Sequence, residues 1–121
     1  MILLGKYQEN ELIKKIRKGF GSTVAYFGYV RDISDGRNVR YMVCGETQNS
    51  QSILKRIEEE IREKYPVKDV LLYHSIGKVD AGNLLAAVLV STIHRDEGFK
   101  ACRYGIDRIK ELEPVEREEF S

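Results

Sequence analysis

The segment Ser91–Pro114, STIHRDEGFKACRYGIDRIKELEP, joins an apolar run to a long amphipathic helical pattern. Its acidic residues Asp96 and Glu97 fall where carboxylates favour the positive end of a helix dipole. We therefore predict a long helix that begins beside His94-Arg95. Apolar residues at helical spacing predict the buried stripe of this helix, which comprises Phe99, Cys102, Ile106 and Ile109.

The segment before this helix, Leu84–Ile93, is almost continuously apolar, which is typical of a central strand covered on both faces or covered on one face by a partner. We expect Gly77–Asn83 to be a turn and Glu116–Glu119 to be a solvated face or tail. The remaining patterns predict strand 1–8, helix 9–18, strands 22–30 and 39–44, helix 53–64 and strand 70–76. This order predicts an α+β fold, a mostly antiparallel sheet with packed helices, in a single domain spanning residues 1–121.

Composition excludes several functional classes. The 121 residues carry a formal net charge of +1, so no global field favours nucleic acid or membrane, and any anion preference must be local. Cys44 and Cys102 form no CxxC motif, and the lone His74 and His94 form no metal-binding constellation; we expect no metal and no cofactor. The longest apolar run, Leu84–Val90, is too short to cross a bilayer, and the N-terminus resembles no signal peptide. We expect a cytoplasmic protein.

Cationic side chains are the remaining candidates for a site. Arg31 lies where a strand gives way to a loop, and His94-Arg95 lies at the start of the long helix, where backbone amides favour an anion. A phosphate-bearing ligand held by these residues is physically reasonable. The alternative is a helix cap and ordinary surface charges. Lys110 lies roughly 24 Å along the helix from His94, so one ligand reaches both only through an elongated pocket or a second chain.

Three segments together resemble the large, catalytic subunit of molybdopterin synthase. They are YFGYVRD (26–32), HSIGKVDAG (74–82) and the 91–114 segment, in the family's order and close to its spacing. The resemblance implies an α/β-hammerhead-like fold and a homodimer within a heterotetramer. A small ubiquitin-like sulfur carrier would insert its C-terminal Gly-Gly tail, as a thiocarboxylate, into the large subunit. Its sulfur would convert cyclic pyranopterin monophosphate to molybdopterin.

The resemblance also assigns roles to residues. Arg31 matches a substrate-contacting arginine, and the pair His94 and Arg95 matches an H-R pair that helps to hold the anionic pterin. Lys110 matches the active-site lysine, which exchanges protons or stabilises an oxyanion near the thiocarboxylate. Because the family site is built at a dimer interface, the distance between His94 and Lys110 is less of an obstacle.

The sequence departs from the family pattern at several positions. Arg117 stands where the family has a second active-site lysine; it can bind a phosphate but cannot transfer a proton. Ser75 replaces an arginine, and the printed sequence ends at Ser121, before most of the family's C-terminal tail. Two functions therefore stay open: a sulfurtransferase in which Lys110 does the chemistry and Arg117 only binds, or a non-catalytic homologue that binds a carrier or pterin without turnover. A generic anion-binding domain is a third alternative.

Overall fold

A computed structural model describes all 121 residues, with three helices and nine strands. The helices are α1 (Glu9–Lys15), α2 (Ser50–Lys64) and α3 (Arg95–Leu112). The strands are β1 (Ile2–Gly5), β2 (Ser22–Tyr29), β3 (Ile33–Ser34), β4 (Arg37–Asn38), β5 (Tyr41–Glu46), β6 (Val67–Ser75), β7 (Gly77–Asp80), β8 (Leu84–Thr92) and β9 (Val115–Phe120). The predicted helices are all present; α1 ends earlier than expected and α2 begins three residues earlier.

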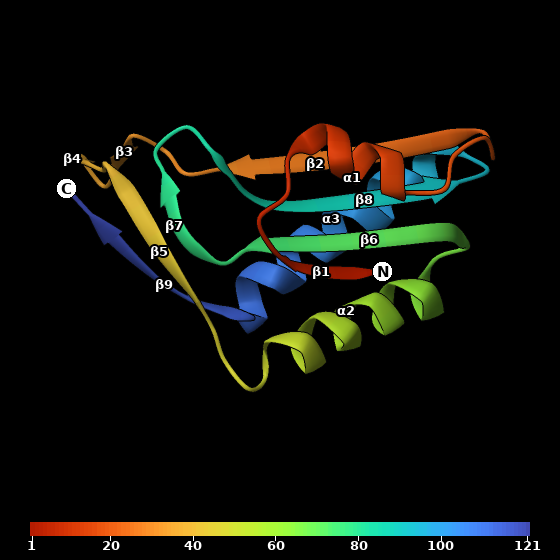
Figure 1. Cartoon of the computed structure of the whole chain (residues 1–121). Helices are drawn as coiled ribbons and strands as arrows, with labels where there is room; N and C mark the ends of the chain where they lie inside the picture. The colour runs from red at the N-terminus through yellow and green to blue at the C-terminus, as the bar shows by residue number, and fades with distance from the viewer.

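The main sheet has four strands in the order β1-β6-β8-β2. Only β1 and β6 pair in parallel; β8 pairs antiparallel with both β6 and β2. Helices α2 and α3 pack on one face of this sheet, and α1 lies on the other (Figure 1). The α+β fold and the central position of Leu84–Thr92 are therefore confirmed.

Alternation along β6 builds both halves of the core. Val70 and Leu72 face α2 and α3, whereas Leu71 and Tyr73 face α1, and all four are buried. Burying each such aliphatic side chain stabilises the fold by roughly 1.5–3 kcal/mol relative to leaving it exposed. The next residue on the face of Val70 and Leu72 is His74, which is also buried.

A second sheet, in the order β7-β5-β9, lies at one end of the first, on the left in Figure 1. It overturns one prediction, because part of Gly77–Asn83 is strand β7. Glu116–Glu119 lies within strand β9, and all four residues are exposed, as expected of a solvated face. The charged sequence of β9 has no apolar alternation to signal a strand. It is held instead by backbone pairing with β5, by burial of Val115 and by stacking of Phe120 on Tyr41 with ring centroids 4.9 Å apart.

The buried face of α3 also differs from the prediction. Phe99 is 61% exposed, so its assignment to the buried stripe is wrong. Small residues pack against the sheet instead: Gly98, Ala101, Cys102 and Gly105. The helix lies so close that a Cβ added at Gly105 would come within 3.1 Å of Val88 Cγ1. Close helix-to-sheet packing therefore turns the large ring of Phe99 outwards.

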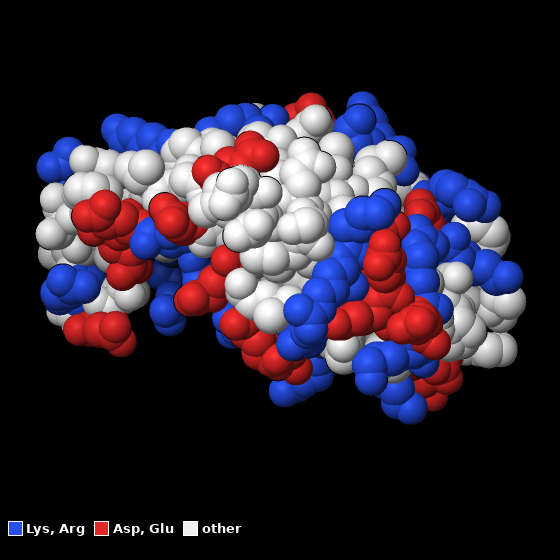
Figure 2. All heavy atoms as spheres, turned by 90° about the horizontal axis from the view of Figure 1, so that it is seen from below, with Lys and Arg blue, Asp and Glu red and all other residues white.

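Charged side chains of both signs lie on the helical face. Figure 2 shows Lys and Arg interleaved with Asp and Glu over part of this face, beside a broad uncharged area. The carboxylate of Glu60 on α2 accepts hydrogen bonds from Arg108 Nε at 2.8 Å and Tyr104 Oη at 2.8 Å, both on α3. These contacts join the two helices.

None of the three helices is long and apolar enough to span a membrane.

Candidate functional site

A cavity opens where the helical face of the main sheet meets the second sheet. One row of residues across β6, β8 and β2 is formed by Leu72, Val88 and Tyr26. The next row on the same face is formed by His74, Ala86 and Gly28. Because Ala86 and Gly28 are small, the second row leaves space that the first row fills. The resulting cavity has a volume of about 980 Å³, and these three residues are among those that line it.

The wall of the cavity comes from the end of α3 and from β9. Lys110 lies in the last turn of α3. The helix ends at Glu113, which takes left-handed backbone angles (φ 45°) while its N–H donates to the Ile109 carbonyl at 3.0 Å. Pro114 follows and prevents the helix from continuing. Strand β9 then pairs with β5 so that Arg117 lies opposite Cys44.

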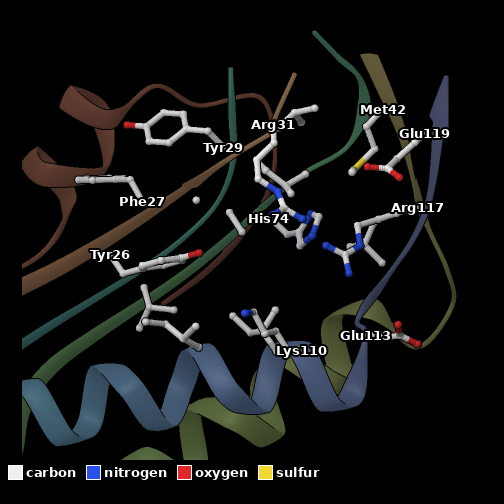
Figure 3. Close-up of a pocket in the computed structure, with 18 of the residues that line it drawn as sticks. Tyr26, Phe27, Tyr29, Arg31, Met42, His74, Lys110, Glu113, Arg117 and Glu119 are labelled. Carbon is white, nitrogen blue, oxygen red and sulfur yellow. The ribbon is translucent and has the colours of Figure 1, made fainter. Parts of the chain in front are cut away.

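Three cations line the cavity from three separate parts of the chain. Arg31 lies in the loop after β2, Lys110 on α3 and Arg117 on β9, and Figure 3 shows them around one space. All three are exposed, and none makes an ion pair or a side-chain hydrogen bond within the chain. Their donors are therefore free to bind an anionic ligand, for which guanidinium groups offer bidentate contacts.

Carboxylates also line this cavity, which makes its charge mixed. The acidic lining residues are Glu113, Glu116 and Glu119. The remaining lining includes Tyr26, Ile106 and Ile109, so an apolar or aromatic group can lie beside the cations. The site can thus bind a ligand that carries both a ring and a negative charge.

His74 is a lining residue whose role we did not predict from the sequence. It is 2% exposed, and its Nδ1 lies 2.9 Å from the Ser75 carbonyl oxygen. Burial lowers the pKa of His74 below its usual value, and repulsion from Arg117 acts in the same direction. The sequence observation that could have revealed His74 is its position two residues beyond Leu72, on the core-facing side of an apolar strand.

The structure places His94 and Arg95 at the opposite end of α3 from Lys110, and neither lines the cavity. Both are exposed. His94 occupies the N-cap position, yet its side chain makes no capping hydrogen bond; the Thr92 hydroxyl instead donates to the His94 carbonyl at 2.6 Å. Of the five predicted site residues, one chain therefore brings together Arg31, Lys110 and Arg117 only.

The cysteines offer no nucleophile to this site. Both are free thiols, and both are buried. Burial raises the pKa of Cys102 to about 11 and also raises the pKa of Cys44, so both thiols are protonated near neutral pH. No three His, Cys, Asp or Glu side chains gather in a way that could hold a metal ion.

The fold and the cavity thus define an α+β protein with a mixed-charge cavity that three unpaired cations line. The family model described as MoaE protein matches residues 5–112, and the chain belongs to this family.

Curated relatives support the same assignment. The molybdopterin synthase catalytic subunit of Pyrococcus abyssi is 35% identical over 103 residues, which are 84% of this chain and 69% of that protein. An uncharacterized protein of Methanocaldococcus jannaschii is 33% identical over 116 residues, covering 90% of this chain and 98% of that protein.

Solved structures agree on the fold. The crystal structure of molybdopterin synthase from Staphylococcus aureus matches with a TM-score of 0.87 and 26% identity, over 98% of this chain and 88% of that one. A chain in the complex of subunits 1 and 2 of the molybdopterin-converting factor from Helicobacter pylori matches with a TM-score of 0.74 and 16% identity, over 98% of this chain and 82% of that one.

Proposed function

We propose that this chain is the catalytic subunit of a molybdopterin synthase. It transfers sulfur from the thiocarboxylated C-terminus of a small ubiquitin-like carrier to cyclic pyranopterin monophosphate. The observation that carries this proposal is the convergence of Arg31, Lys110 and Arg117, all unpaired, on one cavity in a chain of the MoaE protein family.

The three cations have different roles, because a guanidinium group and an ammonium group differ in their chemistry. Arg31 and Arg117 bind the phosphate of the precursor, because guanidinium groups hold phosphate oxygens in bidentate fashion and stay protonated. Lys110 lies beside the carrier's acyl carbon and stabilises the oxyanion that forms there during transfer. Tyr26, Ile106 and Ile109 supply apolar surface for the pterin ring. Arg117 contributes binding but no proton transfer.

The partner is a ubiquitin-like carrier whose Gly-Gly tail enters the cavity as an extended chain. Glycine residues have no side chains, so a Gly-Gly tail suits a narrow approach to Lys110. The cavity volume of about 980 Å³ is at the upper end for one small ligand, which leaves room for the tail beside the pterin. The complex of two subunits named in the Helicobacter pylori structure supports this pairing.

His94 and Arg95 act, in this proposal, on the cavity of a second copy of the chain. Within one chain they lie the length of α3 away from Lys110, about 24 Å along the helix. Two large apolar side chains beside them are exposed, Ile93 at 52% and Phe99 at 61%. Strand β2 is also a free edge of the main sheet. A homodimer that covers this region would bring the His-Arg pair of each chain to the other chain's pterin.

Reconstitution tests the proposed function. The protein is mixed with a thiocarboxylated carrier and the pyranopterin precursor, and molybdopterin is detected by the fluorescence of its oxidised derivative. We expect product that depends on all three components. Tight binding of the carrier without any product would contradict the enzymatic function and establish the non-catalytic alternative.

A further inference from the structure

The cavity contains one buried base that the roles above leave unused, His74. The two residues before it on the same face of β6, Val70 and Leu72, are packed in the apolar core beneath α2 and α3. The imidazole takes the next position in this row, where the core ends and the cavity begins. An apolar side chain would fit the pattern of the strand better, so the imidazole needs an explanation other than packing.

Hydrogen bonding fixes which nitrogen of His74 faces the cavity as a base. Nδ1 lies 2.9 Å from the Ser75 carbonyl oxygen, and a carbonyl only accepts, so Nδ1 carries the hydrogen. In the neutral ring, Nε2 then carries a lone pair. Nε2 has no hydrogen-bond partner in the chain. Every fully buried side-chain nitrogen or oxygen of the chain does have a partner, so Nε2 is not fully buried. Because His74 lines the cavity, Nε2 is accessible from there.

The charged groups that line the cavity with His74 are Arg31 in the loop after β2, Lys110 on α3, Glu113 just after α3, and Glu116, Arg117 and Glu119 on β9. Figure 3 places the His74 ring between Arg31 and Arg117. Burial and the Arg117 charge lower the pKa of His74, which keeps the ring neutral at neutral pH. In the roles above the lysine and the arginines act as cations, and the three carboxylates are exposed. His74 is thus the buried neutral base of the site.

The proposed reaction requires such a base. A thiocarboxylate holds its sulfur on an acyl carbon, so releasing the sulfur leaves that carbon in need of an oxygen atom. Water supplies the oxygen, and the carrier leaves as a carboxylate. Each delivered sulfur therefore consumes one water molecule and releases protons, and neither Lys110 nor Arg117 accepts a proton while it is charged.

We propose that Nε2 of His74 accepts the proton of the water molecule that releases the carrier from the sulfur it has delivered. This inference rests on the proposed function. Once the sulfur has bonded to the pterin, it still links the pterin to the acyl carbon. The water O–H bond breaks, its proton passes to Nε2, and the oxygen bonds to the acyl carbon, with the oxyanion held by Lys110. The C–S bond then breaks and its electron pair leaves on sulfur. The carrier's carboxylic acid and His74 each lose a proton to solvent.

Two substitutions separate a proton acceptor from a structural or hydrogen-bonding residue. His74→Asn keeps an N–H group near the position of Nδ1, to donate to the Ser75 carbonyl, but has no base. His74→Gln keeps an amide near the position of Nε2, which hydrogen-bonds but does not take up a proton at neutral pH. We expect both to slow release of the carrier by about 100-fold or more, with carrier affinity unchanged. A covalent carrier–pterin adduct should accumulate, detectable by mass spectrometry. Release by His74→Gln within about threefold of the wild-type rate would overturn the proposal.

The wild-type protein provides a test that does not depend on how the variants fold. The chain has only two histidines, His74 and His94, so imidazole resonances titrate in a simple NMR spectrum. We expect a buried ring protonated on Nδ1 that titrates below pH 6.5, and a single-turnover release rate that falls with the same pKa as pH decreases. A rate that is independent of this titration, or a ring protonated on Nε2, would contradict the proposal. If the wild-type protein makes no molybdopterin at all, the proposed function itself fails, whereas normal release by the variants contradicts only the role of His74.

Discussion

The two ends of α3 both carry cations, yet their surroundings differ completely. At the C-terminal end, Lys110 lines a cavity with Arg31 and Arg117. At the N-terminal end, His94 and Arg95 are exposed and lie outside that cavity. The sequence presents both groups as candidate anion ligands, but only the second sheet, which packs near one end of the helix, encloses a site. In the proposed function, the C-terminal end does the chemistry within its own chain, and the N-terminal end acts on a neighbouring chain.

The largest effect is expected at the C-terminal end. Lys110→Ala should reduce the rate of sulfur transfer by about 100-fold or more, because it removes the positive charge from the developing oxyanion. Binding of the carrier should remain measurable. Lys100→Ala is the matched control, since Lys100 is exposed on the same helix and outside the cavity. Single-turnover kinetics of both variants give the comparison, and unchanged turnover of Lys110→Ala would refute its role.

A smaller effect is expected at the N-terminal end. Arg95→Ala should weaken binding of the anionic precursor by roughly 10- to 100-fold through loss of a charge-assisted contact. Mixing the Arg95→Ala variant with the Lys110→Ala variant then tests whether Arg95 acts on the cavity of its own chain or on that of the second chain. If Arg95 acts on the second chain, each mixed dimer has one intact site, and random pairing restores about a quarter of wild-type activity. No restoration after verified subunit exchange would place Arg95 in its own chain's site or outside the reaction.

A still smaller effect is expected from Arg117→Lys. The variant keeps the positive charge and gains a group that can exchange protons, so turnover should equal the wild-type rate or exceed it by a few-fold. Steady-state kinetics at saturating carrier measure this. Slower turnover would show that the chain depends on the bidentate geometry of arginine at this position.

The smallest effect concerns the middle of α3, which Glu60 joins to α2. Hydrogen bonds from Arg108 lower the pKa of Glu60 from 4.5 to about 2, so the folded state favours the ionised carboxylate. Its stabilisation is present above pH 4.5 and is lost as pH falls towards 2. Glu60→Gln should lower Tm by about 3 °C or less at pH 7, because the group is partly exposed.

The difference in Tm between this variant and the wild type should shrink as pH falls below 4.5. Glu59→Gln is the control, because Glu59 is exposed and makes no side-chain hydrogen bond or ion pair. Equal Tm values for Glu60→Gln and the wild type at pH 7 would show that the contacts contribute nothing to stability.

The sequence predicts elements well where one face is consistently apolar. Val70 and Leu72 alternate with residues of the opposite face, and Leu84–Thr92 reads as a central strand because it is covered on both sides. It fails for β9, whose charged residues are held by backbone pairing to a strand about 70 residues earlier in the chain. It also fails for Phe99, because the small side chains of α3 fit the sheet more closely than an aromatic ring does.

The sequence also predicts only part of the candidate site. The motifs identify Lys110 and Arg31, but their meeting depends on the register that places Gly28 and Ala86 beside His74. His74 begins the segment HSIGKVDAG, which resembles the family, but that segment alone gives the histidine no chemical role. Its role becomes visible only through the Ser75 carbonyl that fixes its tautomer and the cavity that its other nitrogen faces.

The most direct measurement identifies the lysine that lies within reach of the carrier's C-terminus. Zero-length coupling of carboxyl to amine groups in the assembled complex, followed by peptide mass spectrometry, locates that contact. We expect an isopeptide bond between the terminal glycine and Lys110, the one lysine that lines the cavity. Coupling to Lys100 or another lysine outside the cavity, with Lys110 unmodified in a saturated complex, would contradict it.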